Sequence, residues 1–421
     1  MSKILFILRC YSGFEQSLIN KKWEPSGAPT IAKILEIFQH ENENNVLFLY
    51  RSNNEKIRSI KERKIKIKNL SLPIYLLKTN FFYFQSTKLS KLYTEIYHLI
   101  FIIFYLIKLK PKLIYSDHSN IHFTSLIARY LNIKTVIRLM GVKNDMRDCL
   151  INNSVYFKIL NWSYRAPFSL VLATQDGAGS EIWMKKALSK KVPRKTLLNG
   201  VDLSIIPKSI KIKNNIYKNK FIITFIGRLE EDKAPDRFLE AFIKVKNKIP
   251  DKFHSFIIGS GSMKKKLTNM INKANAANDV SFFSNINHSG IYYLLNKTDI
   301  YVSLNRMGNF SNTNIEAMAM GKTIIMPKSK VKEGIDIYTD KVIKDNAVYR
   351  VNSSDSIDEI CNAIIILADN NNLRNSLESE IKNMADKVIH SWEKRIAWEY
   401  DLLKSINSYD KDKIIKYLES I

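Results

Sequence analysis

The stretch from Asp299 to Pro327, DIYVSLNRMGNFSNTNIEAMAMGKTIIMP, constrains the fold of this chain more than any other. It predicts a short buried strand at 299–304, a polar loop at 305–313, a helix at 314–320 that ends at Gly321, and a second strand. Such a strand–loop–helix unit directs the free amides of the first helical turn at one point, where phosphate is a common occupant. Glu316 lies in that first turn, where a carboxylate either reaches a ligand or only complements the helix dipole.

The same alternation of strand and helix runs through the whole chain and predicts an α/β fold built from doubly wound sheets. With 421 residues the chain is too long for one core. A polar, basic segment with a proline marks a linker. The predicted parts are a first domain at 1–204, the linker at 205–219, a second domain at 220–390 and a terminal helical segment at 391–421 that we expect to pack back on the first domain.

Two features of the first domain are candidates for function. The first strand, 3–9, opens into a polar segment, 10–29, that contains Gly13 and Gly27. A loop of this length inside a compact domain is usually functional. His118 follows the strand at 112–116, at the sheet edge where ligands bind in open α/β folds. It is either an acid–base or ligand-positioning group, or a strand-end histidine with ordinary hydrogen bonds.

The charge of the chain is high and uneven. The net charge is +26, and residues 1–210 carry 33 Lys+Arg against 14 Asp+Glu. A basic first half implies an anionic neighbour such as a membrane surface. The segment 88–112 places an apolar run between lysines, which fits a core helix with snorkelling lysines or a membrane-surface contact. The run itself, 99–107, is about half as long as a bilayer span, so no transmembrane helix is expected. No nucleic-acid recognition motif accompanies the charge, so no nucleic-acid partner is predicted.

The three cysteines, Cys10, Cys149 and Cys361, are widely spaced and form no disulfide framework or metal cluster. We therefore expect a reducing compartment, the cytoplasm, and no metal site.

Basic and glycine residues follow two strands of the second domain. Arg228 and Lys233 lie in one loop after the strand at 221–226, and two cations at this spacing can converge on a diphosphate. Gly227 and Gly261 permit close approach of the backbone. Together with the helix that begins near residue 312, these loops predict a diphosphate site.

At these residues the chain resembles the group 1, or family 4, retaining glycosyltransferases. The resemblance rests on four motifs: Gly227-Arg-Leu-(x)₃-Lys233, Gly259-Ser-Gly261, Asn312-Thr-Asn-Ile-Glu-Ala-Met-Ala-Met-Gly321 and Asn199-Gly-Val-Asp202. It implies the GT-B arrangement, with two Rossmann-like domains facing a cleft. It also implies a nucleotide diphosphate sugar as donor substrate, no further cofactor, no metal, and transfer with retention at the anomeric carbon.

The resemblance also implies roles for single residues. Arg228 and Lys233 would neutralise the leaving diphosphate as its charge grows in the transition state. Glu316 would bind the ribose hydroxyls. The backbone around three residues would bind phosphate, and the early loop would face the donor phosphates or the acceptor. The phosphate-binding residues are Phe310, Ser311 and Asn312, and the loop glycines are Gly13 and Gly27.

Two departures from the family pattern bear on activity. Gly308 stands where the family has the first glutamate of its E-x₇-E motif, which contacts the donor sugar. Met140 stands where the family often has a histidine before a glycine, and His118, one strand earlier, is the candidate substitute.

We therefore expect a metal-independent retaining glycosyltransferase that acts on a lipid-linked or polysaccharide acceptor in surface glycan synthesis. Its expected location is the cytoplasm, peripheral at the inner face of the cell membrane. A non-catalytic subunit that binds nucleotide sugar or glycan is the alternative, which Gly308 and Met140 favour. A nucleotide-sugar epimerase of the same fold is the weaker alternative.

Overall fold

The computed structural model describes residues 3–41, 43–52, 54–79, 87–202, 204–210, 217–284, 286–406 and 411–420. The chain divides into two compact units. The first unit holds Met1–Thr174, Ser180–Leu197 and Glu393–Ile421, and the second holds Gln175–Gly179 and Leu198–Trp392. The second unit thus resumes at Leu198, inside the stretch 1–204 that the sequence assigns to the first domain. Residues 211–216 of the predicted linker lie outside the described residues.

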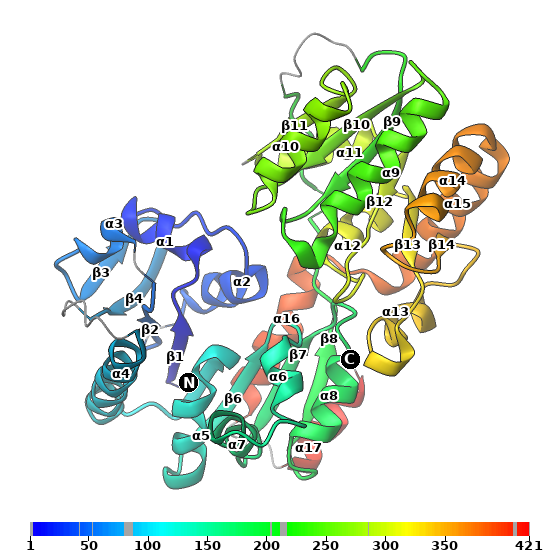
Figure 1. Ribbon diagram of the computed structural model, residues 1–421. Coiled ribbons are helices and arrows are strands. Elements are labelled where there is room, and N and C mark those ends of the chain that lie inside the picture. Colours follow the sequence, from blue (N-terminus) through cyan, green and yellow to red (C-terminus); the bar gives the residue numbers. More distant parts are fainter. Residues whose placement is uncertain are drawn as a thin grey trace. The chain divides into compact units, whose positions relative to one another are not determined.

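The first unit is built on an eight-stranded sheet with the order β3-β4-β2-β1-β5-β6-β7-β8 (Figure 1). All neighbouring strands are parallel except the β3–β4 pair. The strands are β1 (Ile4–Arg9), β2 (Asn45–Leu49), β3 (Lys64–Ile67), β4 (Leu70–Leu77), β5 (Leu113–Asp117), β6 (Lys134–Leu139), β7 (Leu170–Thr174) and β8 (Arg194–Leu197). The helices are α1 (Ser12–Ile19), α2 (Pro29–Phe38), α3 (Glu55–Arg58), α4 (Thr87–Leu109), the 3₁₀ turn η1 (His118–Asn120), α5 (Ile121–Tyr130), α6 (Asn144–Asp148), α7 (Val155–Tyr164), α8 (Ser180–Ala187), α16 (Trp392–Ser405) and α17 (Lys411–Ser420).

Alternating side chains of β1 supply the two cores of this unit, because successive strand residues point to opposite faces of a sheet. Phe6 and Leu8 pack with α2 and with the C-terminal helix α16. Leu5 and Ile7 pack on the other face with α4 and α5. Both faces of the sheet are therefore covered, which is the doubly wound arrangement.

The terminal segment is tied to the first unit by a buried charge network. Glu399 of α16 accepts hydrogen bonds from Tyr115 of β5 and from the guanidinium groups of Arg138 and Arg395, at 2.8, 3.1 and 2.9 Å. The two cations hold the pKa of Glu399 below its usual range even though burial acts in the opposite direction. The C-terminal helix is thus part of the first unit's core.

The second unit has a six-stranded parallel sheet with the order β11-β10-β9-β12-β13-β14. Its strands are β9 (Phe221–Ile226), β10 (Phe253–Ile258), β11 (Val280–Phe283), β12 (Ile300–Val302), β13 (Thr323–Pro327) and β14 (Tyr349–Val351). Its helices are η3 (Glu231–Lys233), α9 (Pro235–Lys248), α10 (Lys264–Lys273), α11 (His288–Asn296), α12 (Asn312–Ala319), η4 (Val331–Glu333), α13 (Ile337–Val342), α14 (Ile357–Asp369) and α15 (Asn371–Val388).

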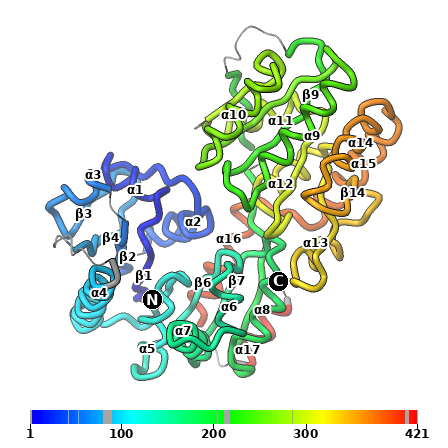
Figure 2. Tube along the Cα trace, viewed as in Figure 1, coloured from blue at the N-terminus to red at the C-terminus, as the bar shows by residue number. Residues whose placement is uncertain are grey.

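Both units are Rossmann-like α/β domains, so the predicted fold class is confirmed. One local expectation was wrong: the segment 10–29 contains helix α1, which buries Phe14 and Leu18, and is not a continuous loop. Figure 2 follows the chain from β1 through this helix into α2. The sequence did not predict this helix because Phe14 and Leu18 are surrounded by glycine, serine and proline, which favour turns.

Candidate functional site

The candidate site lies where three neighbouring parallel strands of the second unit end. β9 lies between β10 and β12 in the sheet, so the loops that follow these strands meet at one edge. They are the loops after residues 226, 258 and 302, which are the three segments that carry the sequence motifs. Arg306 joins the third loop to the first, with its amide donating to the Asp232 carbonyl at 2.9 Å and its guanidinium to the Glu231 carbonyl at 2.6 Å.

The loop after β9 holds two cations on either side of one carboxylate. A guanidinium nitrogen of Arg228 lies 3.2 Å from Asp232, and the Lys233 ammonium lies 3.4 Å from the same oxygen. The Arg228 side chain is exposed, whereas Lys233 is only 20% exposed. Asp232 thus holds both cations at one place, where a diphosphate would meet two positive charges.

Glycines in the first two loops mainly allow the loops to pack against each other. A Cβ on Gly259, whose φ is +147°, would lie 1.8 Å from the Gly227 carbonyl oxygen. A Cβ on Gly261 would lie 2.4 Å from the Leu229 carbonyl oxygen. Gly227 itself has room, because its nearest neighbour would be a Phe225 ring atom at 3.5 Å. The structure therefore explains Gly261 by loop packing and leaves Gly227 without a steric requirement.

Helix α12 begins at Asn312, and its N-cap residue, Ser311, makes no side-chain capping hydrogen bond. The Ser311 hydroxyl donates instead to the Asn314 side chain at 2.9 Å. The N-cap side chain therefore satisfies none of the amides of the first turn, and the first-turn amides of a helix are a common anion site. The Phe310 amide, by contrast, donates to the Asp176 carbonyl at 3.0 Å, so the prediction that it binds phosphate does not fit the structure.

Glu316 lies on α12 and is buried, with 6% of the residue exposed. One carboxylate oxygen lies 3.5 Å from Nδ1 of His288, and the other has no hydrogen-bond partner among the residues that the structure describes. Burial, with Asp202 nearby, raises the pKa of Glu316 to about 8. A buried carboxyl oxygen without a partner is unusual in a folded protein and suits a group that accepts a ligand hydroxyl.

The segment Asn199–Asp202 lies beside this helix. The Asn199 side-chain amide donates to the Asn312 side chain at 2.6 Å, and Asp202 is close enough to Glu316 to raise its pKa. The sequence suggested these motifs separately, and the fold brings them together.

A segment from far along the chain also lies at this site, although the sequence assigns it to the first domain. Gln175–Gly179 belongs to the second unit, and its carbonyl groups accept from the Phe310 amide at 3.0 Å and from the Asp336 amide at 2.7 Å. Asp336 in turn accepts from the Asn309 amide and from the Asn309 side chain, both at 2.7 Å. The only local signal was the pair of glycines, Gly177 and Gly179, after a buried strand.

This segment explains Gly308. The φ of Gly308 is +128°, and a Cβ there would lie 2.5 Å from the Asp176 carbonyl oxygen and 2.7 Å from the Ala178 amide nitrogen. A glutamate side chain has no room at this position. Burial raises the pKa of the Asp176 carboxyl to about 6. The charge of Lys233 acts to lower this pKa, and the charge of Asp336 acts to raise it.

The predicted residues of the first unit form a separate polar group. His118 is buried, and its Nδ1 has no hydrogen-bond partner in the described part of the chain. Burial lowers the pKa of His118 to about 4, so the ring is neutral at physiological pH. The adjacent Asp117 accepts from the Arg9 amide, the Tyr11 hydroxyl and the Ser119 amide at 2.6, 3.0 and 2.8 Å.

The two loop glycines of this unit lie close to one another. The Ser26 amide donates to the Gly13 carbonyl at 3.0 Å, and a Cβ on Gly13 would overlap the Ser26 carbonyl oxygen. Gly27 has a φ of +76° and open space around it.

No cluster of three or more His, Cys, Asp or Glu side chains able to hold a metal occurs in the described part of the chain.

Comparisons with known proteins agree with this geometry. Residues 208–384 match the family model of the glycosyl transferases group 1. An uncharacterised glycosyltransferase of Methanocaldococcus jannaschii, MJ1069, is 27% identical over 231 residues, which cover 50% of this chain and 55% of that protein. The chain thus spans about half the length of the curated relative it matches.

Solved structures share the fold across nearly the whole chain. Sucrose-phosphate synthase from Thermosynechococcus elongatus has a TM-score of 0.71 at 13% identity and covers 96% of this chain and 99% of its own. Anabaena Alr3699/HepE in complex with UDP has a TM-score of 0.66 at 15% identity and covers 96% and 100%. The fold is therefore that of the GT-B glycosyltransferases.

Proposed function

We propose that this chain is a retaining glycosyltransferase that uses a nucleotide diphosphate sugar. The proposal rests on one observation: four features lie at the same edge of the sheet. They are Arg228, Lys233, the start of α12, whose N-cap side chain does not cap it, and the buried Glu316. Cations and helix amides suit the diphosphate, and the partnerless oxygen of Glu316 suits a ribose hydroxyl. HepE, which shares the fold, binds UDP, and this supports a nucleotide donor.

The chemistry follows from where charge develops. When the bond between the anomeric carbon and the diphosphate breaks, negative charge grows on the diphosphate oxygens. Arg228 and Lys233 stabilise this charge more in the transition state than in the bound donor, and such a difference accelerates the reaction. Because two side-chain cations can neutralise the leaving diphosphate, we propose that transfer needs no metal ion. Activity that EDTA abolishes and a divalent cation restores would contradict this.

Binding of UDP and GDP, measured by calorimetry, tests the site. Lys233→Ala should weaken the binding of the preferred nucleotide by about 30- to 150-fold, since a hydrogen bond to a charged group contributes about 2–3 kcal/mol. Lys387→Ala, an exposed lysine of α15, is the matched control and should bind like the wild type. Equal affinity of Lys233→Ala and the control would refute the site.

A non-catalytic subunit that binds nucleotide sugar is the second candidate, because Gly308 and Met140 replace two side chains of the family pattern. Slow hydrolysis of the donor, measured as nucleotide diphosphate release without acceptor, separates the two candidates. Release that Arg228→Ala abolishes would support the enzyme. Tight nucleotide binding without any release or transfer would support the binding subunit.

We further propose that the acceptor is lipid-linked or a surface polysaccharide and that the protein acts in the cytoplasm at the inner membrane face. The excess of basic residues in 1–210 supports this location, because the cytoplasmic leaflet is anionic. The sugar product with a retained anomeric configuration, identified by NMR, would test the stereochemistry once a donor is known.

A further inference from the structure

Helix α4 (Thr87–Leu109) is apolar on two opposite faces. One face is buried: Ile102, Tyr105 and Leu106 pack against the sheet of the first unit. The other face is exposed and equally apolar. Its members, with their exposed fractions, are Leu89 (56%), Leu92 (57%), Tyr93 (39%), Ile96 (49%), Ile100 (59%), Ile103 (48%), Phe104 (49%) and Ile107 (69%).

The exposed residues form one continuous stripe. At about 100° per residue they all fall within an arc of about 120°, and at about 1.5 Å per residue the stripe is about 27 Å long. The exposed face of a surface helix is normally polar and charged. A contiguous apolar patch of this size on a soluble surface marks an interaction site.

Two other helices of the first unit also carry exposed apolar residues. They are α5 and α7, which pack against each other (Figure 1). The Arg129 guanidinium of α5 lies 4.2 Å from the centre of the Trp162 ring of α7. The most exposed apolar residues in this part of the unit are Tyr130, Ile151 and Val155. We call the exposed stripe of α4 the apolar face.

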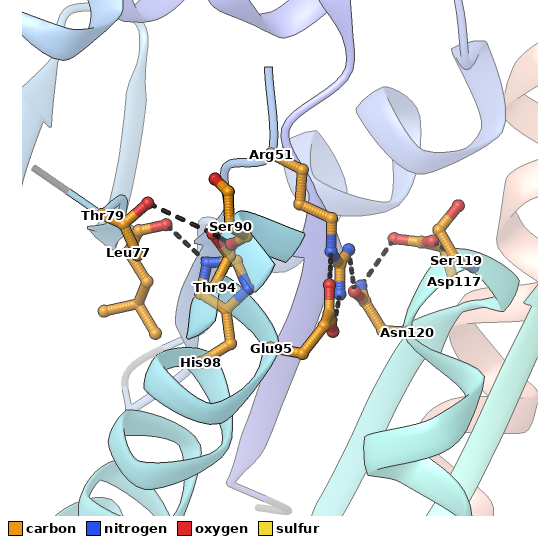
Figure 3. A network of polar contacts seen from close by, with 10 residues as sticks. All are labelled: Arg51, Leu77, Thr79, Ser90, Thr94, Glu95, His98, Asp117, Ser119 and Asn120. Atoms are coloured by element: carbon orange, nitrogen blue, oxygen red, sulfur yellow. Dashed lines mark hydrogen bonds and ion pairs between the residues drawn. The ribbon is translucent and has the colours of Figure 1, made fainter. Parts of the chain in front are cut away.

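The charges around the α4 stripe are positive. Lys91, Lys108, Lys110 and Lys112 are exposed in and just after the helix. The one acidic residue of α4, Glu95, is neutralised by Arg51, whose Nε lies 2.6 Å from it. Figure 3 shows this pair and the bond from Arg51 to Asn120 beside Asp117. Apolar side chains with lysines near the C-terminal end of the helix suit the acyl chains and anionic headgroups of a lipid surface.

We propose that the apolar face lies in the plane of an anionic lipid bilayer, with its apolar side chains among the acyl chains and the lysines at the headgroups. The proposal makes specific the membrane location proposed above. It does not depend on the sugar chemistry, because none of its residues lies in the second unit.

The fold favours an in-plane helix over a spanning one. Leu89–Leu109 is long and apolar enough to cross a bilayer by length and composition, contrary to the expectation from the shorter run 99–107. A crossing would remove the buried side of α4 from the sheet and expose the cores of β1, β2 and β4. It would also break the Arg51–Glu95 pair and the 3.1 Å hydrogen bond between His98 and the Leu77 carbonyl. An in-plane helix keeps these contacts and covers the exposed stripe.

Co-sedimentation with vesicles tests the proposal, using the full chain and two compositions: phosphatidylcholine alone, and phosphatidylcholine with phosphatidylglycerol. Binding is expected to the anionic vesicles and to weaken as salt is raised, because screening weakens the lysine contribution. The double variant Ile100→Glu, Ile107→Glu should reduce vesicle binding by at least about tenfold. The control, Ile366→Glu on α14, changes an isoleucine of similar exposure (44%) in the second unit and should bind like the wild type.

Folding and nucleotide binding are measured on the same variants. Both substitutions lie on exposed positions, so the far-UV spectrum, melting temperature and nucleotide affinity of the double variant should match the wild type. If vesicle binding is absent while nucleotide binding is intact, the membrane inference fails and the proposed function stands. If nucleotide binding is absent while vesicle binding is intact, the proposed nucleotide site fails and the membrane inference stands.

Three outcomes overturn the proposal: no binding of the wild type to anionic vesicles at low salt, equal binding of the double variant and the wild type, and membrane-bound protein that alkaline carbonate does not release. The last would indicate a spanning helix. A lipid-free dimer that the double variant converts to monomer, without vesicle binding, would assign the apolar face to a second copy of this chain instead.

Discussion

Replacing Gly308 by alanine should destabilise the second unit far more than its small size suggests. The φ of +128° is a region that side chains avoid, at a cost of about 1–3 kcal/mol. The new Cβ would also lie 2.5 Å from the Asp176 carbonyl oxygen and 2.6 Å from the Gly177 carbonyl carbon. Both contacts are with backbone, which cannot rotate away, so overpacking adds about 1–3 kcal/mol.

The matched control is Gly321→Ala, which also has a positive φ, +64°, but whose Cβ would meet nothing closer than 3.5 Å. It should cost about 1–2 kcal/mol. The difference between the variants is then about 2 kcal/mol, or a melting temperature of the second unit about 4–8 °C lower for Gly308→Ala. Differential scanning calorimetry with and without nucleotide measures it.

A melting temperature for Gly308→Ala equal to that of Gly321→Ala would refute the steric account of Gly308. The same account predicts that Gly308→Glu, which restores the family's first glutamate, destabilises the unit and does not increase donor binding. Tighter donor binding by Gly308→Glu would show that segment 175–179 moves aside easily.

Other predictions concern buried groups and glycines. The folded state raises the pKa of Glu316 from 4.5 to about 8, so the folded protein holds a proton that the unfolded chain releases between these values. Its stability should therefore fall by a few kcal/mol as pH rises from about 4.5 through about 8, and Glu316→Gln should flatten this dependence in urea titrations. Glu399→Gln should destabilise the first unit by about 3–5 kcal/mol, because two buried guanidinium groups lose their counter-charge; an unchanged urea midpoint would contradict this. Gly227→Ala should leave the melting temperature nearly unchanged while Gly259→Ala lowers it, since only the second Cβ overlaps a carbonyl oxygen; the reverse order would contradict the loop packing.

Much of the fold followed from local patterns. Apolar runs predicted strands such as 3–9 and 112–116 in the first unit and 221–226 and 299–304 in the second, and the alternation with helices predicted two Rossmann-like domains. The motif residues Arg228, Lys233 and Glu316 could be proposed as site residues because each follows or begins an element at the edge of the sheet where ligands bind in such folds. These signals lie within a few residues of one another, so they are readable from the sequence.

The failures came from interactions over long separations. Helix α1 was missed because its burial depends on Trp23, which stacks on the Phe14 ring, and on Phe48, whose ring packs against it at a tilt. The Phe310 amide is bonded to Asp176, which lies more than a hundred positions away. The pKa of Glu316 likewise depends on Asp202, which is also more than a hundred positions away. Tertiary context decides such contacts, and no local propensity records them.

The sequence by itself determined the architecture of two Rossmann-like domains, the loop that carries the two cations and the helix that carries Glu316, because periodicity and strand-end chemistry are local properties. Only the tertiary structure decided that segment 175–179 closes over Gly308, that Asp202 and burial together raise the pKa of Glu316, and that α4 exposes an apolar stripe. An apolar residue in a helix pattern does not reveal whether it faces the core or the solvent when both faces are apolar. Burial is settled by which surfaces the rest of the chain covers.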